Sequence, residues 1–550
     1  MKRRTKLGAL LLTAVVCLGA LTGCGEETTA NELEVRVGLS ALPVSGDPVM
    51  ETSADGQTVL LHLYEGLMKK TADGAGTVSA APAMARSYNE EENFDGTVVY
   101  TFKLRESAKW SDGKPVTAED FVYAWQRLVN PATGSPNHSL LRMVEGYGAA
   151  RSSGDATKLA VSAKNENTLV VKLSYRCPYF ISDVCTAVAT APLRQDVTAR
   201  EGWADQWAGM MTNGAYQVMQ NQGDELDLVR SAAYYDDRVL GPAAISMRKL
   251  DAAAAWQAYQ AGELDAVSAL PEEQLAERAK NPAWKPAVEA DTYSIVFNNS
   301  TAPLDDPLVR RALSLAIDRS ALTAVAGAGT VAAEGLVPAG IAGKDAETDF
   351  RTEGGALLPT EAEDYAANSQ TAKELLAQSG YSGGEAFPAL TLLYVSDGAD
   401  AAVQGAVAAT VRTMWQGVLR VNVEVKAVTQ AELAQALRTG AYNMAAMAVG
   451  TEVNDAAGYL DRWHSGDEDN VADYANSAFN TLVEVIHSAY DETARMGLLH
   501  DAEQLLLDDA ALAPLFTQGG GWELRQGLTG AFRDALGRLY LGSVMVDINA

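Results

Sequence analysis

A strand pattern and a helix pattern follow one another between residues 95 and 131. Segment 98–104 alternates apolar and polar side chains after the turn signal Asp95-Gly96, which predicts a half-buried strand. The next apolar residues recur at helical spacing, which predicts a helix with one buried stripe. The stripe consists of Phe121, Trp125, Leu128 and Val129.

The charged residues of segment 108–128, AKWSDGKPVTAEDFVYAWQRL, raise the question of an active site. Thr117 with Asp120 three residues later is a near capping box, and acidic residues in a first helical turn complement the helix dipole. The helix is expected to end at Asn130-Pro131. Because each charge has a structural role available, the segment is interpreted as scaffold.

A second pattern alternates strands and helices between residues 390 and 449. The predicted strands span 390–395, 421–428 and 442–449. One helix between them ends near Trp415, and another surrounds Leu433 and Leu437. Such runs build right-handed, mainly parallel sheets whose ligands lie beyond the carboxyl ends of the strands. The residues just after Val449 are therefore expected near a ligand.

The N-terminus predicts export and a lipid anchor. Four basic residues precede the apolar run 7–23, which is short for a membrane span and has no basic stop-transfer flank. The run ends in Leu21-Thr22-Gly23-Cys24, which resembles a bacterial lipobox; an ordinary cleaved signal is the alternative. We expect a signal peptide at 1–23, acylation of Cys24, including palmitate, and a polar tether at 24–32.

Charge and length narrow the possible functions. Removal of residues 1–23 takes the formal net charge from −28 to −32. A surface this acidic repels phosphate backbones, so nucleic acid is not an expected partner. The mature chain is too long for one core and is expected to form two or three domains. Cys177 and Cys185 either pair or remain buried thiols, and two cysteines alone make no structural zinc site.

The residues of segment 100–131, YTFKLRESAKWSDGKPVTAEDFVYAWQRLVNP, resemble the signature of extracellular oligopeptide-binding proteins. These are family 5 solute-binding proteins, the receptors of peptide-importing ABC transporters. The similarity covers nearly the whole mature chain. Further matches are HLYEGL (62–67), TNGAY (212–216), AYQAGELDAV (258–267), PLDDPLVRRALSLAIDRSAL (303–322) and AKELLAQSGY (372–381).

The resemblance implies an α/β, two-lobed periplasmic-binding-protein-like fold of type II, with three domains and a hinged ligand cleft. The first lobe is expected to combine a discontinuous core with an inserted small domain, and residues 291–520 to form the second lobe. The core comprises 33–64, 193–290 and 521–550, and the inserted domain comprises 65–192.

The resemblance also implies a function. Family members bind a peptide as an added strand, and a buried acidic residue pairs with its α-amino group. The expected protein is a monomer on the extracellular face of the cytoplasmic membrane. It delivers oligopeptides to the permease subunits of an ABC transporter and has no cofactor and no metal. A receptor for another solute, such as a metal chelate, is the alternative.

Site residues are transferred from the family position by position. In segment 449–460, VGTEVNDAAGYL, Glu452 falls where the family has the aspartate that holds the ligand amine, and Asp455 is the rival anchor. Ala448 and Gly450 fall where backbone groups pair with the peptide.

Further matches lie elsewhere in the chain. Thr52, Ser53 and Ala54 match the opposite wall of the groove, and Arg438 matches an arginine that meets the ligand's carboxylate. Asn137 occupies a segment that often carries tyrosines. Aromatic or cationic family positions are replaced here by Leu140, Ala431, Ala446 and Val449, so the preferred ligand is expected to be shifted.

A catalytic alternative rests on the segment 380–384, GYSGG, which fits the G-x-S-x-G pattern of a nucleophile elbow around Ser382. That motif requires a strand before it and a helix after it, whereas the predicted order here is the reverse. The five histidines show no metal-ligand spacing, and the acidic run at 466–470 lacks the pattern of a calcium loop. The sequence therefore predicts a binding protein and not an enzyme, with a lipid-anchored serine hydrolase as the alternative.

Overall fold

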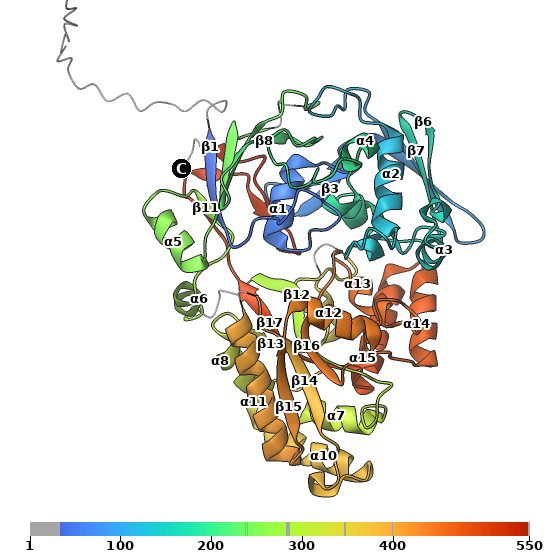
Figure 1. Cartoon of the computed structure of the whole chain (residues 1–550), viewed down its shortest axis with the longest axis vertical. Helices are drawn as coiled ribbons and strands as arrows, with labels where there is room; N and C mark the ends of the chain where they lie inside the picture. Colours follow the sequence, from blue (N-terminus) through green and yellow to red (C-terminus); the bar gives the residue numbers. More distant parts are fainter. Residues whose placement is uncertain are drawn as a thin grey trace, which may run out of the picture.

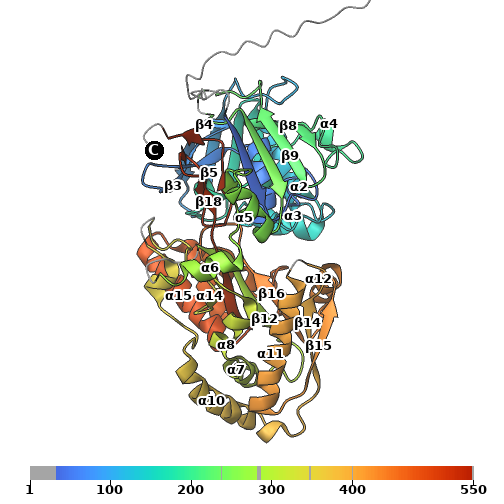
Figure 2. The same ribbon diagram turned by 90° about the vertical axis from the view of Figure 1, so that its left-hand side faces the viewer.

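The computed structural model describes residues 33–236, 238, 240–281, 287–345, 348–398 and 400–547. The predicted signal peptide 1–23, Cys24 and tether 24–32 lie outside the described residues. Two lobes are stacked along the long axis of the molecule (Figures 1 and 2). The chain enters the second lobe at β12 (Ala287–Phe297) and leaves it after β17 (Leu512–Gly520). No described helix has both the length and the apolar character that a bilayer crossing requires.

The main sheet of the first lobe draws its strands from three distant parts of the chain, in the order β18-β11-β1-β10-β9-β8. The strands are β1 (Glu34–Leu39), β8 (Tyr216–Asn221), β9 (Glu225–Arg230), β10 (Ala244–Lys249), β11 (Ala266–Val267) and β18 (Glu523–Leu524). Strand β1 pairs in parallel with β10 and β11, and its side chains Val35, Val37 and Leu39 are buried in the core. All these strands fall within the segments assigned to the first-lobe core.

Helices and short hairpins complete this part of the first lobe. The helices are α1 (Ala54–Leu63), α4 (Gln195–Thr198), α5 (Ala252–Gln260) and α6 (Glu272–Arg278). The hairpins pair β19 (Leu528–Thr529) with β22 (Met545–Val546), and β20 (Phe532–Arg533) with β21 (Leu539–Tyr540). Ser53 caps the N-terminus of α1, and its Oγ accepts a hydrogen bond from Gly56 N at 3.1 Å.

The inserted segment forms its own sheet, in the order β4-β5-β7-β6. Its elements are β2 (Met68–Ala72), β3 (Val78–Pro82), β4 (Ala85–Glu92), β5 (Val98–Leu104), α2 (Ala118–Val129), α3 (Tyr147–Ser153), β6 (Val161–Asn165) and β7 (Thr168–Leu173). The predicted strand and helix are confirmed, including the buried stripe and the capping box of Thr117 and Asp120. Asp120 also accepts a hydrogen bond from Trp110 Nε1 at 3.2 Å, so its carboxylate belongs to the scaffold. Cys177 and Cys185 are free, buried thiols.

The second lobe contains a mixed sheet in the order β13-β17-β12-β16-β14-β15. The remaining strands are β13 (Val331–Ala332), β14 (Leu390–Val395), β15 (Val423–Val428) and β16 (Met444–Val449). The predicted parallel unit is confirmed for β14, β15 and β16, but β12 pairs antiparallel with both β16 and β17. The expectation of a mainly parallel sheet was therefore wrong for its other half. The helices are α7 (Pro307–Leu315), α8 (Arg319–Ala326), α9 (Phe350–Gly354), α10 (Tyr365–Gln378), α11 (Ala401–Leu419), α12 (Gln430–Thr439), α13 (Ala457–Leu460), α14 (Ser477–Ser488) and α15 (Glu492–Asp508).

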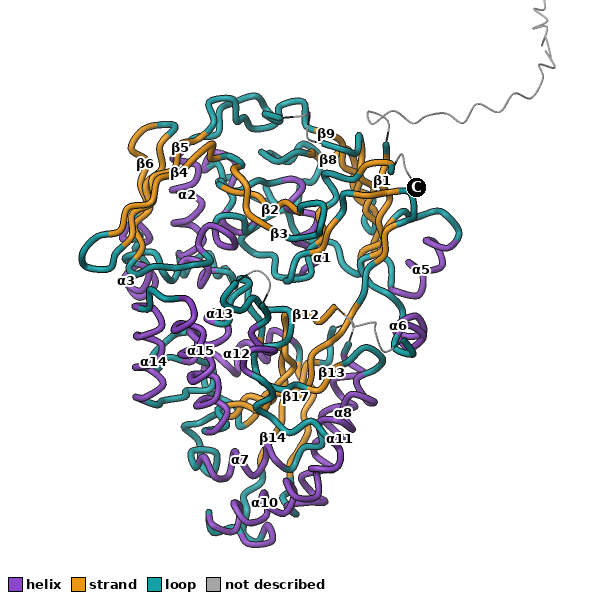
Figure 3. The backbone as a smooth tube through the Cα atoms, turned by 180° about the vertical axis from the view of Figure 1, so that it is seen from behind, coloured by secondary structure: helices purple, strands orange, loops and turns teal. Residues whose placement is uncertain are grey.

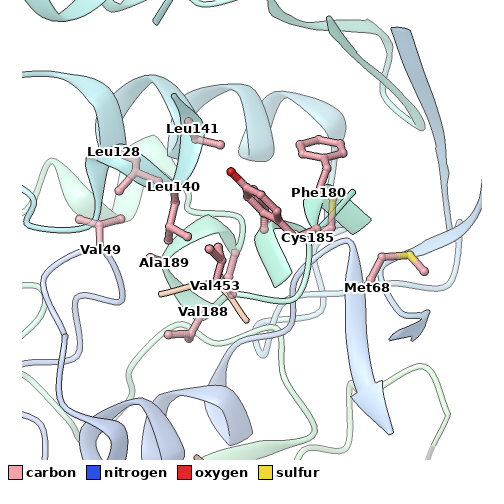
Figure 4. Packing of buried hydrophobic residues seen from close by; sticks show 14 of the residues in the cluster. Val49, Met68, Leu128, Leu140, Leu141, Phe180, Cys185, Val188, Ala189 and Val453 are labelled. Carbon is pink, nitrogen blue, oxygen red and sulfur yellow. The ribbon is translucent and has the colours of Figure 1, made fainter. Parts of the chain in front are cut away.

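One apolar core continues from the first lobe into the loop that follows β16. Val453 of that loop packs near Leu140, Val188 and Ala189 of the inserted segment (Figure 4). Helices α14 and α15 of the second lobe lie directly below α3 of the inserted segment (Figures 1 and 3). The two lobes are therefore in contact, and the loop after β16 lies between them.

Candidate functional site

Two cavities lie where the lobes meet, and a third adjoins them within the second lobe. The terminal cavity, of about 270 Å³, lies between residues 136–143 and 450–462. The central cavity, of about 400 Å³, lies between residues 52–57 and Arg533 on one side and Glu289 and Asp291 on the other. The strand cavity, of about 340 Å³, lies between β16 and α12.

Shared residues join these cavities into one cleft. Thr52, Thr451 and Glu452 line both the terminal and the central cavity. Glu289 and Asp400 line both the central and the strand cavity. Asp291, on β12, lines all three, and its side chain is exposed to them.

The backbone of β16 offers an edge inside this cleft. Strand β16 pairs with β12 along its whole length, but its pairing with β14 is confined to Met444 and Ala445. The stretch 446–449 therefore has one edge that β14 does not pair, and Ala448 lines the strand cavity there. A free strand edge presents backbone N–H and C=O groups that an extended ligand can pair.

Glu452 lies at the junction of the terminal and central cavities. Its Oε2 accepts a hydrogen bond from Gln57 Nε2 of α1 at 2.9 Å. Burial raises the pKa of Glu452 to about 7, while the Arg538 guanidinium and the Gln57 hydrogen bond act in the opposite direction. The carboxyl group thus has acceptor capacity left for a ligand and titrates near neutrality.

Asp455 lies away from the cleft. Its carboxylate forms a buried ion pair with Arg495 of α15, at 2.7 Å to Nη2 and 2.9 Å to Nη1. It lines none of the three cavities. Of the two anchors expected from the sequence, Glu452 alone faces the cleft in the described residues.

The structure places the first-lobe residues that were expected to form one wall of the groove at the cleft. Thr52, Ser53 and Ala54 line the central cavity, and Thr52 also lines the terminal cavity. Asn137 lines the terminal cavity, and its buried amide donates to the carbonyl oxygens of Val49 at 3.1 Å and Glu51 at 2.9 Å. Asn137 therefore holds the segment that leads to Thr52.

Gly450 packs closely against the side chain of Asp291. A Cβ atom at Gly450 would lie 1.5 Å from Asp291 Oδ1, so a larger residue displaces that carboxylate. Gly450 itself lines the terminal cavity. The glycine thus allows Asp291 to occupy the centre of the cleft.

Arg438 lies outside the cleft in this arrangement. It is exposed on α12 and contacts Gln435 of the same helix. Leu433 and Leu437 of α12 line the strand cavity, whereas Arg438 does not. The structure therefore does not bring Arg438 together with the other expected site residues.

Several cleft residues had not been identified from the sequence. They are Gln57, Arg142, Glu289, Asp291, Asp400, Arg462 and Arg533. Glu289 and Asp291 are two positions apart on β12, so they lie on the same face of the strand, and this acidic pair was the signal available in the sequence. Although both side chains are open to the cleft, the protein atoms around them reduce their contact with bulk water and raise the pKa of both carboxyl groups. Aromatic walls come from Tyr179, Tyr293 and Phe516 and not from the expected family positions.

Ser382 lies in a short turn, Ser382–Gly384, between α10 and β14. A helix precedes it and a strand follows it, which is the reverse of the order around a nucleophile elbow. In the described part of the chain, no group of His, Cys, Asp and Glu side chains is arranged to hold a metal ion.

Residues 79–470 match the Bacterial extracellular solute-binding proteins, family 5 Middle. The chain is 31% identical over 496 residues to the periplasmic oligopeptide-binding protein OppA of Haemophilus influenzae, covering 86% of each chain. It is 29% identical over 539 residues to OppA of Salmonella typhimurium, covering 94% of this chain and 93% of that protein.

Solved structures show the same fold. H. influenzae OppA in complex with RPPGFSPFR matches with a TM-score of 0.74 over 94% of this chain and 99% of that one, at 26% identity in the structural comparison. The Escherichia coli murein tripeptide binding protein MppA matches with a TM-score of 0.75, over 94% of this chain and 98% of that one at 25% identity. Its unliganded open form, also at 25% identity, matches with a TM-score of 0.67 and coverage of 94% and 97%. The two-lobed fold of the periplasmic binding proteins is thus confirmed, and the chain belongs to the bacterial extracellular solute-binding proteins of family 5.

Proposed function

We propose that this protein is the lipid-anchored receptor of a peptide-importing ABC transporter, and that it encloses oligopeptides between its lobes. The observation that carries the proposal is the position of Glu452 beside the free edge of β16. A carboxylate there pairs with the ligand's α-amino group, while the edge pairs with its backbone. Backbone pairing gives affinity for many sequences, which suits a receptor for peptides.

The first-lobe wall of the cleft supports the same position for an extended ligand. Thr52 and Ser53 are exposed to the cleft from the first lobe, so an extended ligand would lie between them and the loop after β16. The loop lies between the lobes, so a ligand paired with it is enclosed when they close. Closure then creates the surface that a permease recognises, as expected of a hinged receptor.

The ligand-free protein, stripped of co-purified ligand by unfolding and refolding, tests this proposal in a thermal shift assay with a mixture of tetrapeptides. We expect stabilisation of about 2.7 kcal/mol at a hundredfold excess over Kd. Turnover of a peptide or ester panel that Ser382→Ala abolishes would instead establish the hydrolase. Release of the protein from membranes by Cys24→Ala tests the lipid anchor, and retention contradicts it.

A further inference from the structure

Arg462 is a cation without a partner in the terminal cavity. It follows α13, and its guanidinium has no hydrogen bond or ion pair with any residue that the structure describes. Its Nε is buried and unpaired. Arg142 lines the same cavity but is held by Asp467 and Asp469, each at 3.0 Å. Of these two cations, Arg462 alone has its charge available to a ligand.

The carboxylates around Arg462 leave it unpaired. Asp467 and Asp469 are bonded to Arg142, and Asp291 acts on Arg462 through its charge without forming an ion pair. Asp461, which lines the same cavity, is bonded to His487 Nε2 at 3.1 Å through Oδ2, and its Oδ1 is buried without a hydrogen bond. Burying a guanidinium without an anion is unfavourable, so an anionic ligand group that reaches Arg462 removes an existing penalty. A carboxylate matches the planar guanidinium in two parallel hydrogen bonds.

The position of the cavity specifies which part of a ligand reaches it. Glu452 lies at the boundary between the terminal and central cavities, and the free edge of β16 lies along the strand cavity. A ligand whose amine pairs with Glu452 and whose backbone follows β16 leaves the terminal cavity to the side chain of its first residue. This placement rests on the proposed function.

We propose that Arg462 selects peptides whose first residue carries a carboxylate, with the ammonium at Glu452 and the side-chain carboxylate at Arg462. The rest of the cleft does not favour an acidic residue. Glu289 and Asp400 are exposed along the central and strand cavities, where Arg533 is the cation. Asp291 lines all three cavities, but only in the terminal cavity does it share the lining with Arg462. The preference for a carboxylate is therefore specific to the first position.

Calorimetric titration at pH 7.5 with Glu-Ala-Ala-Ala, Gln-Ala-Ala-Ala and Ala-Ala-Glu-Ala separates position from net charge. We expect the first peptide to bind roughly ten- to hundredfold more tightly than the other two, as for a charge-assisted hydrogen bond. Arg462→Gln removes this preference. The matched control Arg412→Gln, on the exposed face of α11, retains it.

Equal binding of the Glu-first and Gln-first peptides by the wild-type protein overturns the inference and leaves the proposed function intact. An equal loss of affinity for both peptides in Arg462→Gln also overturns it. Absence of binding to all three peptides contradicts the proposed function and the inference together. The comparison of the Glu-first and Gln-first peptides uses the wild-type protein alone, so it tests the inference even if Arg462→Gln does not fold.

Discussion

Gln57 and Glu452 join the two lobes at the centre of the cleft. Gln57 Nε2 of α1 donates to Glu452 Oε2 at 2.9 Å, and Arg538 Nη1 donates to Gln57 Oε1 at 3.2 Å. Arg538 is in turn paired with Asp534 at 2.7 Å. A relay of first-lobe residues thus positions the second-lobe carboxyl group. The candidate anchor is therefore oriented by the contact between the two lobes.

Replacing Glu452 by Gln is expected to weaken the binding of free-amine peptides by roughly 2–5 kcal/mol, because a buried ammonium loses its counter-charge. Titration calorimetry measures the change. Glu273→Gln, on the exposed face of α6, is the control and leaves affinity unchanged. Wild-type affinity in Glu452→Gln would show that the amine is bound elsewhere.

Binding should depend on pH through Glu452. Its pKa of about 7 means that the carboxyl group must lose a proton before it can pair with an ammonium, so affinity falls up to about tenfold per pH unit below that value. Above a pH of about 8 the peptide amine loses its own proton. Affinity is therefore expected to be greatest between pH 7 and 8. The dissociation constant is measured from pH 5.5 to 8.5, and Glu452→Gln should flatten the acidic side.

The raised pKa of Glu452 also affects the stability of the ligand-free protein, which is expected to fall, and not to rise, as the carboxyl group loses its proton. The pKa of Glu452 in the folded protein lies above its ordinary value of 4.5. Its contribution to the free energy of unfolding is therefore fully present below pH 4.5 and is lost as pH rises through about 7, where the enclosed carboxyl group becomes charged. Urea denaturation of wild type and Glu452→Gln should converge at pH 4.5. At pH 8, Glu452→Gln should be the more stable protein. Equal pH profiles for the two proteins contradict the raised pKa.

Asp455→Asn is expected to act on stability. The change leaves Arg495 as a buried charge without its main partner, which costs about 3 kcal/mol in the free energy of unfolding. Peptide affinity of the folded protein should stay near the wild-type value. The double variant Asp455→Asn/Arg495→Met recovers part of the loss, because both charges leave together. Weakened binding with unchanged stability would instead make Asp455 a ligand anchor.

Ion pairs of Arg142 and Arg151 with the acidic run 467–469 are expected to hold the two lobes together. Arg142 contacts Asp467 and Asp469, and Arg151 contacts Glu468 through two bonds of 2.6 Å. These pairs connect the inserted segment to the second lobe.

The double variant Arg142→Gln/Arg151→Gln should shift the ligand-free protein towards a form with its lobes apart. Peptide binding should weaken several-fold, because the peptide must then bring the lobes together as it binds. Small-angle scattering measures the larger radius of gyration. Arg412→Gln is the control, and an unchanged radius and affinity in the double variant exclude a role in closure.

The sequence predicts local structure well where neighbouring residues decide it. Segment 98–129 carries its own alternation, cap and helical stripe, and β5 and α2 follow from these features. The antiparallel half of the second-lobe sheet could not be predicted in the same way, because β12 and β17 are more than 200 residues apart in the chain.

The choice between Glu452 and Asp455 depended on distant residues. They are three positions apart, and only the position of Arg495, 40 residues beyond Asp455, shows which carboxylate is already paired. Arg438 and Leu437 are adjacent on α12, yet only Leu437 lines the strand cavity. The acidic pair Glu289 and Asp291 puts both side chains on one face of β12, but only the tertiary contacts with the first lobe show that this face lines a cleft.

The central claim is that Glu452 binds the α-amino group of an enclosed peptide. Its most direct test is calorimetric titration of the ligand-free protein at pH 7.5 with Glu-Ala-Ala-Ala and its N-acetylated form. We predict that the free-amine peptide binds and that acetylation weakens binding by roughly 2–5 kcal/mol, because it removes the charge that pairs with Glu452. Equal affinity for the two peptides would contradict the claim.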